Sequence, residues 1–267
     1  MMAKQFGAEV SLVTKVGYDF PDEYALWLSR NQLNLAPESK SKKGRTTRFR
    51  IDIQDHERIL RLLSRCEDLD LKQLSGSDAI IVSGIANEIS TEFLERAKAL
   101  TKFLFIDPQT IVRSFSLEGI CKVTTPRNPD VIYLASAVKA DSQEACLLTG
   151  KTDKVQAAKQ LVDSGIEIVL ITDKGEVLLA TKGDFFSVNV RPSNVVDTTG
   201  AGDIFAGAFV ASLMKSSDPV WACCVAASAS TLAVGQIGIS KVPSADSVIE
   251  KAETIRKSGI HRLSLSS

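Results

Sequence analysis

The sequence predicts an α/β protein whose mostly parallel sheet is covered by helices on both faces. Short apolar runs rich in β-branched residues alternate with longer amphipathic stretches along most of the 267 residues. Strands that alternate with helices form right-handed crossover units, which place parallel strands between two helical layers. With 44% hydrophobic residues the chain can bury one large core, so we expect a single domain over residues 1–267.

The elements of the first half follow from these patterns in chain order. Apolar or alternating runs predict strands at Glu9–Val16, Ala79–Ser83 and Lys102–Ile106. Amphipathic spacing predicts helices at Pro21–Leu33 and Ser90–Leu100. Residues 36–46 are polar and basic, which is typical of a solvated loop, and an alternating strand follows them at Thr47–Ile53.

The second half continues the alternation. A β-branched buried run predicts one strand and two further runs predict a hairpin, at Glu167–Thr172, Glu176–Ala180 and Phe185–Val190. Helices are expected at Asp141–Leu148, Lys154–Ser164, Ala201–Met214, Val220–Val234 and Asp246–Lys257. Ligands of such sheets bind beyond the carboxyl ends of the strands, so we expect the functional site at that edge.

Composition excludes several classes of partner. A net charge of zero gives no electrostatic reason to bind nucleic acid or an anionic membrane. No apolar run reaches the roughly 18 residues of a membrane span, and the first residues lack a signal-peptide pattern, so we expect a cytosolic protein. Five cysteines without Cys-x-x-Cys spacing indicate reduced thiols, and two distant histidines do not predict zinc.

The run Asp197-Thr198-Thr199-Gly200-Ala201-Gly202-Asp203 carries the clearest chemical signal. It precedes the helical stretch Ile204–Met214, so its backbone NH groups and the positive end of the helix dipole can bind an anion. The Asp203 carboxylate can accept a proton from a hydroxyl while phosphoryl charge rests on those NH groups. Each feature alone also has a structural explanation, because first-turn aspartates favour the dipole and paired glycines form tight turns.

The complete run resembles the signature of the ribokinase-like PfkB family of carbohydrate kinases, Asp-Thr-x-Gly-Ala-Gly-Asp before an apolar helix. The resemblance implies a three-layer ribokinase-like fold with a small β lid, which residues 36–55 would supply in part. It implies ATP-dependent phosphoryl transfer to a sugar or a polyol such as inositol, with Mg²⁺ as a cofactor. Asp203 would be the general base, and Gly200, Ala201 and Gly202 would form the anion hole.

Two further segments resemble the family, one near the start of the chain and one near its middle. Gly7–Gly17, followed by Asp19-Phe20, is similar to the early strand and Gly-x-Asp turn. Asp141 to Glu144 resembles the Asn-x-x-Glu segment with Asp in place of Asn, which implies that Glu144 acts through water on the metal. The same two residues also fit a helix capping box, and the two interpretations are compatible.

The nucleotide side is implied by residues after the next strand. Thr172, Lys174 and Gly175 resemble the strand end and turn along which the nucleotide lies, although this turn is shorter than the usual Thr-x-Gly-x-x-Gly. Residues 227–238 resemble the helix and loop that close over the adenine, with Thr199 and Gly238 as further nucleotide contacts. Asp197 and Thr199 could hold a monovalent cation such as K⁺, whereas Gly238 also fits a helix C-cap.

The acceptor side is implied by residues after two early strands. Ser83-Gly84-Ile85 and Asp107-Pro108-Gln109 with Arg113 resemble family members that include inositol-like and archaeal sugar kinases. Asp107, Gln109 and Arg113 would bind the substrate, and the Arg113 guanidinium suits a phosphate. A surface salt bridge is the alternative for Arg113.

One part of the family pattern has no counterpart before Gly7, namely an amino-terminal strand with a substrate-binding Asp and a Gly-Gly and Asn loop. We therefore expect that part of the pattern to lie upstream. Two alternatives to a sugar or polyol kinase are a nucleoside kinase of the same fold and a degenerate nucleotide-binding protein that lacks the acceptor site.

The expected partner is a small-molecule sugar or polyol. The sequence does not distinguish a monomer from a homodimer.

Overall fold

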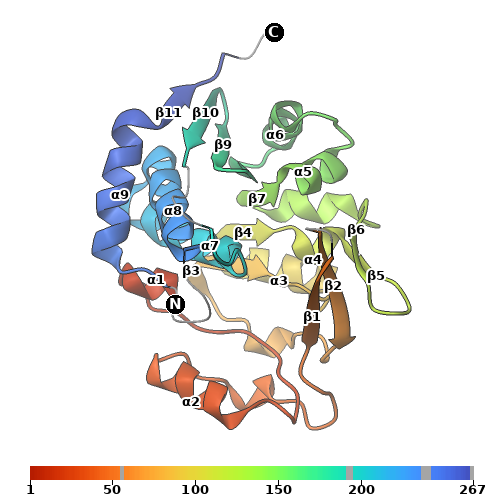
Figure 1. Cartoon of the computed structure of the whole chain (residues 1–267). Coiled ribbons are helices and arrows are strands. Elements are labelled where there is room, and N and C mark those ends of the chain that lie inside the picture. The colour runs from red at the N-terminus through yellow and green to blue at the C-terminus, as the bar shows by residue number, and fades with distance from the viewer. Residues whose placement is uncertain (55–56, 191–194, 236–241, 265–267) are drawn as a thin grey trace.

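A seven-stranded sheet forms the centre of the molecule, with helices on both of its faces (Figure 1). The computed structural model describes residues 1–54, 57–190, 195–235 and 242–264. The strand order is β11-β10-β9-β8-β7-β4-β3, in which β3, β4, β7 and β8 are parallel and β9 to β11 are antiparallel. These strands span Ser77–Ser83 (β3), Thr101–Asp107 (β4), Ala137–Asp141 (β7), Ile168–Asp173 (β8), Glu176–Thr181 (β9), Asp184–Asn189 (β10) and Ile260–Arg262 (β11).

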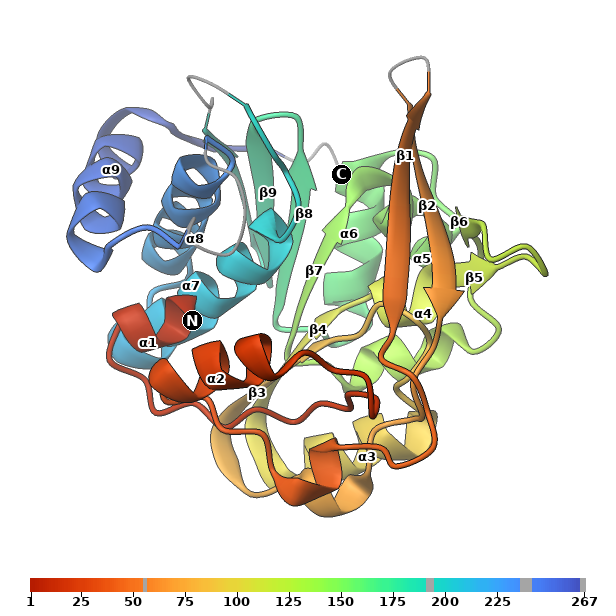
Figure 2. The ribbon, with the colours of Figure 1, turned by 60° about the horizontal axis from the view of Figure 1, so that its bottom comes forward.

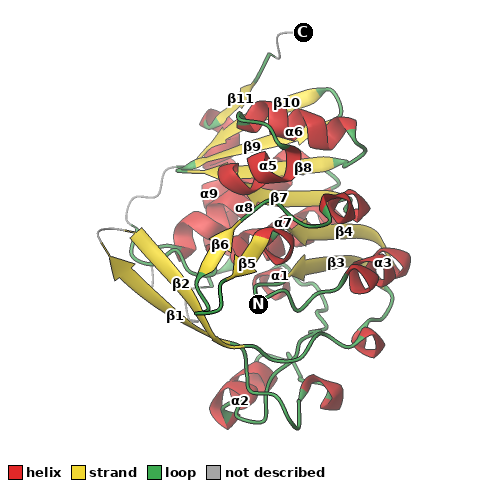
Figure 3. Cartoon of the chain, turned by 90° about the vertical axis from the view of Figure 1, so that its right-hand side faces the viewer, coloured by secondary structure: helices red, strands yellow, loops and turns green. Residues whose placement is uncertain are grey.

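Each face of the sheet has its own hydrophobic core. Helices lie on both faces of the sheet (Figure 3), so the α/β fold class is confirmed. One face packs against Met2–Gln5 (α1), Ala201–Ser216 (α7), Pro219–Ala233 (α8) and Ala245–Ser258 (α9). The other packs against Thr91–Leu100 (α3), Gln109–Val112 (α4), Ser142–Thr149 (α5) and Lys154–Asp163 (α6). The ring of Phe105 on β4 lies 5.9 Å from that of Phe209 on α7, which fixes α7 across the parallel strands.

Most expected elements are confirmed, because their local signals and their burial agree. The helix expected at Pro21–Leu33 forms as α2 (Asp22–Arg30), and the hairpin forms as β9 and β10. The strand expected at Glu9–Val16 is wrong. Residues 9–15 pair with no strand among the described residues, and Val16 alone forms a bridge, with Lys40. Apolar and β-branched residues do not form a strand without a neighbouring strand to pair with their backbone NH and carbonyl groups.

Two antiparallel ribbons stand apart from the main sheet (Figure 2). The strand expected at Thr47–Ile53 forms as β1 (Arg48–Gln54), which pairs with β2 (Glu57–Ser64). A shorter ribbon pairs β5 (Arg113–Phe115) with β6 (Cys121–Val123), and Arg61 forms a bridge to Ile120 between the two ribbons. Among the helices that the structure describes, none is long and apolar enough to cross a membrane.

Candidate active site

The carboxyl ends of three parallel strands meet the first turn of α7. Ser83 ends β3, Asp107 ends β4, and Lys139 lies near the end of β7. Helix α7 packs directly against β3 and β4, which brings Asp203 close to these strand ends. The sequence predicted a site at this edge of the sheet. The structure brings four residues together there: Ser83, Asp107, Gly202 and Asp203.

The first turn of α7 presents an exposed carboxylate beside backbone amides. Gly200 is the N-cap residue and has a φ of 75°, a left-handed conformation that glycine adopts at no steric cost. The Ala201 amide donates to the Thr198 carbonyl oxygen at 3.2 Å, whereas the amides of Gly202 and Asp203 have no intrahelical acceptor by position. Asp203 is exposed, and the Ser83 hydroxyl donates to its Oδ1 at 2.8 Å.

A buried ion pair lies beneath this turn. Lys139 Nζ is 3.1 Å from Asp107 Oδ2, with side-chain exposures of 7% and 3%. A Cβ atom at Gly202 would lie 3.1 Å from Lys139 Nζ, so the turn can approach the ammonium this closely because residue 202 is glycine. Burial lowers the pKa of Lys139, but the neighbouring carboxylates of Asp107 and Glu144 outweigh it and the pKa is raised.

Sequence reasoning missed Lys139. The signal was present as a lysine within a short apolar run, Ala-Val-Lys-Ala, directly before the Asp141 segment. A charged residue in an otherwise buried strand has to be paired, and such pairs cluster at functional sites. The hydroxyl of Ser83 was quoted for its resemblance, but its contact with Asp203 joins positions 120 residues apart and has no local signal.

The start of α5 carries the expected capping box. Asp141 Oδ1 accepts from the Glu144 amide at 2.8 Å, and Glu144 Oε2 accepts from the Asp141 amide at 2.9 Å. Glu144 is 4% exposed, and burial together with the charges of Asp141 and Asp107 raises its pKa to about 7. A desolvated carboxylate of this kind is stabilised by a divalent cation, so the residues present fit Mg²⁺.

A pocket of about 290 Å³ lies between the turn after β8 and the facing ends of α7 and α8, where the sequence predicts the nucleotide. Its lining includes Thr172, Lys174, Gly175, Ala201 and Thr231. Lys174 and Gly175 form a two-residue turn, because Asp173 and Glu176 are directly paired, which agrees with the short turn read from the sequence. Gly238 lies outside the described residues.

The two residues proposed for a monovalent cation lie in a loop tied to the end of α8. Asp197 Oδ1 accepts from the Thr199 amide at 2.8 Å, and the Asp197 amide donates to the Val234 carbonyl oxygen at 3.1 Å. The Asp197 carboxylate therefore already orders the loop that leads into the Gly200 turn. A carboxylate oxygen is also a suitable ligand for a hard cation.

The expected acceptor residues lie around the end of β4. Asp107 is 2% exposed, its Oδ1 accepts from the Gln109 amide at 3.2 Å, and its Oδ2 faces Lys139. Gln109 begins α4 and is partly exposed, and Arg113 begins β5, where it pairs with Val123. The structure thus keeps Gln109 beside Asp107 and places Arg113 at the edge of the short ribbon.

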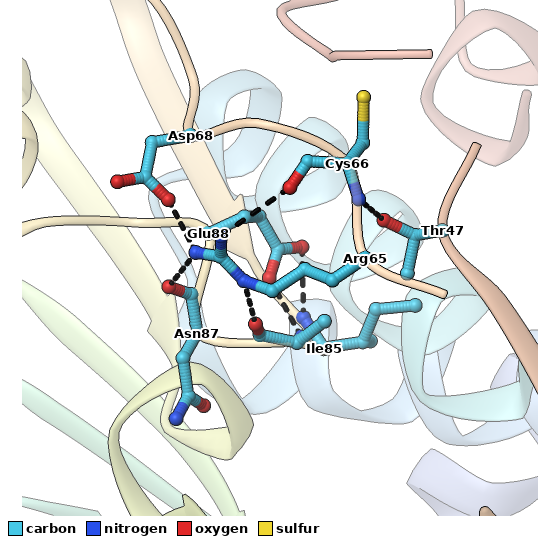
Figure 4. A network of polar contacts seen from close by, with 8 residues as sticks. Thr47, Arg65, Cys66, Asp68, Ile85, Asn87 and Glu88 are labelled. Atoms are coloured by element: carbon cyan, nitrogen blue, oxygen red, sulfur yellow. Dashed lines mark hydrogen bonds and ion pairs between the residues drawn. The ribbon is translucent and has the colours of Figure 1, made fainter. Parts of the chain in front are cut away.

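A polar network fixes the loop after β3 to the base of the β1–β2 ribbon (Figure 4). The Arg65 guanidinium donates to the carbonyl oxygens of Ala86 and Asn87, at 2.8 and 2.7 Å, and pairs with Asp68. The Glu88 carboxylate accepts from the Ile85 and Ala86 amides at 3.0 and 2.6 Å. Since this loop begins directly after Ser83, the network helps to fix the chain at the carboxyl end of β3. Sequence reasoning did not identify Arg65.

A larger cavity of about 880 Å³ lies at the other end of the strands. It is lined by Ile166, Glu167, Lys182, Phe185 and Arg262, among others, and contains none of the expected site residues. The expected site residues therefore gather at the carboxyl edge of the sheet and not in this larger cavity.

Comparison with known proteins defines the class of the molecule. A family model described as pfkB family carbohydrate kinase matches residues 1–245. The chain therefore belongs to this family, and the enzyme class expected from the sequence is confirmed.

Curated relatives of the chain include kinases of two acceptor classes. A cytidine kinase of Thermococcus kodakarensis is 25% identical over 218 residues, which cover 77% of this chain and 74% of the relative. An inositol 3-kinase of Oryza sativa subsp. japonica is 26% identical over 248 residues, covering 89% of this chain and 60% of the relative.

Among solved structures, a pyrophosphate-dependent kinase in the ribokinase family, complexed with a pyrophosphate analog and myo-inositol, has a TM-score of 0.80. It is 19% identical, and the match covers 92% of this chain and 87% of that chain. At this identity the likeness concerns the fold, and the ribokinase-like fold expected from the sequence is confirmed.

Proposed function

We propose that this protein transfers a phosphoryl group from Mg-ATP to a hydroxyl of a sugar or a polyol such as inositol. The observation that carries the proposal is the exposed Asp203 carboxylate in the first turn of α7, with the amides of Gly202 and Asp203 beside it. Asp203 accepts the proton of the acceptor hydroxyl. The backbone amides and the helix dipole stabilise the negative charge of the group in transfer.

The pocket beside Thr172, Lys174, Gly175 and Thr231 suits the nucleotide, because it opens between the strand turn and the start of α7. Bound Mg²⁺ would neutralise phosphate charge, and Glu144 would hold it through water. Asp197 and Thr199 would hold K⁺ beside the anion turn. Gly200 and Ala201 complete the anion hole in this proposal, in which a phosphoryl oxygen replaces the Thr198 carbonyl oxygen as the acceptor of the Ala201 amide. Gly238 contributes to the nucleotide side.

Asp107, Gln109 and Arg113 form the proposed acceptor side, and residues 36–55 with β2 form a partial lid over it. The ribbon stands beside the carboxyl edge of the sheet, and Arg65 ties its base to the loop after Ser83. A lid excludes water from the phosphoryl group, which favours transfer to the acceptor over hydrolysis. The whole chain then acts as one kinase domain.

A nucleoside is the second candidate acceptor, because the cytidine kinase relative matches over 77% of this chain. The two acceptor classes are separated by following ADP formation from Mg-ATP with a panel of sugars, inositols and nucleosides. The proposal predicts ADP formation that depends on a sugar or a polyol. Dependence on nucleosides alone would favour the second candidate, and ADP formation without any dependence on an acceptor would contradict both.

The donor is tested in the same assay by replacing ATP with inorganic pyrophosphate and following the phosphorylated product. This arm is included because a pyrophosphate-dependent kinase shares the fold. Product formation with pyrophosphate and not with ATP would overturn the donor assignment and leave the acceptor assignment standing.

A further inference from the structure

Lys139 has no part in the chemistry proposed above, yet it lies at the centre of the site. Its Nζ contacts Asp107 Oδ2 at 3.1 Å, and its side chain is only 7% exposed. The ammonium is therefore shielded from solvent by the sheet below it and by the first turn of α7. Two strands contribute the pair, β7 and β4, which are hydrogen-bonded neighbours.

Stability alone does not account for this ion pair. The desolvation of two charges can cost more free energy than their attraction provides. A protein with an apolar pair of similar volume in their place is often equally stable or more stable. The surroundings are also rich in carboxylates, since Asp107, Glu144 and Asp141 all act electrostatically on Lys139. These charges keep the lysine protonated despite its burial.

The link to the anion turn is steric. A Cβ atom at Gly202 would lie 3.1 Å from Lys139 Nζ and 3.9 Å from Asp107 Oδ2. The first turn of α7 therefore packs against the ion pair at Gly202. The amide of Gly202 is one of those proposed to bind the phosphoryl group. A fixed charge in a site shielded from water acts on its neighbours more strongly than it would in solvent.

We propose that Lys139 is a positioning residue for phosphoryl transfer: its buried ammonium supports the Gly202 turn above Asp107 and adds a permanent positive charge behind the anion-binding amides. The inference rests on the proposed function. It extends that function because it attributes part of the affinity for the anion to a side chain that does not contact the substrate.

The test compares Lys139→Met, the double variant Lys139→Met with Asp107→Leu, and Lys159→Met as the matched control, because Lys159 pairs with Asp163 at the opposite end of the strands. Two properties are measured for each protein: its thermal midpoint, and its affinity for inorganic pyrophosphate by titration calorimetry. Lys139→Met leaves the buried Asp107 carboxylate unpaired, so the thermal midpoint should fall. It also removes the ammonium behind the anion-binding amides, so the pyrophosphate affinity should fall by about tenfold. The double variant should regain its thermal midpoint and still bind pyrophosphate about tenfold more weakly than the wild type. Lys159→Met removes a lysine away from the site, so its pyrophosphate affinity should equal that of the wild type.

A stable double variant with wild-type pyrophosphate affinity would overturn the inference, because the pair would then be structural. Absence of pyrophosphate binding by the wild-type protein would overturn it as well. Lys139→Arg provides a second route, because it keeps the charge and should hold the affinity within about threefold of the wild type. If the wild type phosphorylates no acceptor while these affinities follow the predicted order, the proposed function fails and the role of Lys139 in anion binding stands.

Discussion

Gly202→Ala tests the anion turn with a single methyl group. The added Cβ would lie 3.1 Å from Lys139 Nζ, closer than ordinary van der Waals contact, and 3.9 Å from Asp107 Oδ2. Lys139 is buried and paired, so moving its ammonium away from the added methyl group weakens its ion pair with Asp107. Either the lysine moves away from Asp107 or the first turn of α7 rises.

The free energy of unfolding should change little. Crowding a packed interior costs about 1–3 kcal/mol, and alanine in place of glycine within a helix returns about 1 kcal/mol. The net loss is about 0–2 kcal/mol, which lowers the thermal midpoint by up to about 8 °C. Turnover should fall about tenfold or more, because small displacements of positioned groups are costly to catalysis.

Thermal melts and steady-state kinetics on the same preparation separate the two effects. Gly76→Ala is the matched control, because its Cβ would meet the Leu100 carbonyl oxygen at 3.8 Å, an ordinary contact at the start of β3 and away from the site. The control should keep wild-type turnover. A Gly202→Ala protein with wild-type turnover would refute the reasoning, whatever its stability.

Three further predictions follow from contacts around the turn. Ser83→Ala removes the donor to Asp203 Oδ1 and should lower kcat about tenfold, with partial recovery in Ser83→Thr; steady-state kinetics giving an unchanged kcat would contradict it. In metal-free buffer the raised pKa of Glu144, about 7 against 4.5 in the unfolded chain, means that the folded form retains the proton between these values. The free energy of unfolding should therefore fall by up to about 3 kcal/mol as pH rises through this window, and urea melts of Glu144→Gln should lack this fall. Arg65→Met removes the donors to Ala86 and Asn87, so it should cost about 1–2 kcal/mol in melts and raise KM for the acceptor more than for the donor; equal changes in both KM values would count against the acceptor-side role.

The sequence predicted the elements whose local signals agree with their final burial. The run Glu167–Thr172 reads as a buried strand and forms β8 between β7 and β9, and the capping box of Asp141 and Glu144 forms as its spacing implies. The signature run was located correctly at the start of α7, because an apolar helix after a glycine-rich turn has a clear boundary.

The features that the sequence did not predict are contacts between residues far apart in the chain, which no local pattern shows. Residues 9–15 are rich in the apolar and β-branched residues that favour a strand, but strand formation depends on a neighbouring strand, which no local pattern specifies. The pairs Lys139–Asp107 and Ser83–Asp203 join residues 32 and 120 positions apart, and each becomes visible only when the strand ends are brought together. Arg65 likewise reaches a loop more than 20 positions away.

The central claim, that Asp203 is the general base of a kinase acting on a hydroxyl, is tested most directly by comparing Asp203→Asn with the wild type. The measurement is the acceptor-dependent rate of ADP formation on one accepted sugar or polyol, with Mg-ATP affinity determined in parallel. Asparagine keeps the size and polarity of the side chain but cannot accept the proton, so turnover should fall by about 100-fold or more while Mg-ATP still binds. Turnover near that of the wild type in Asp203→Asn would contradict the account.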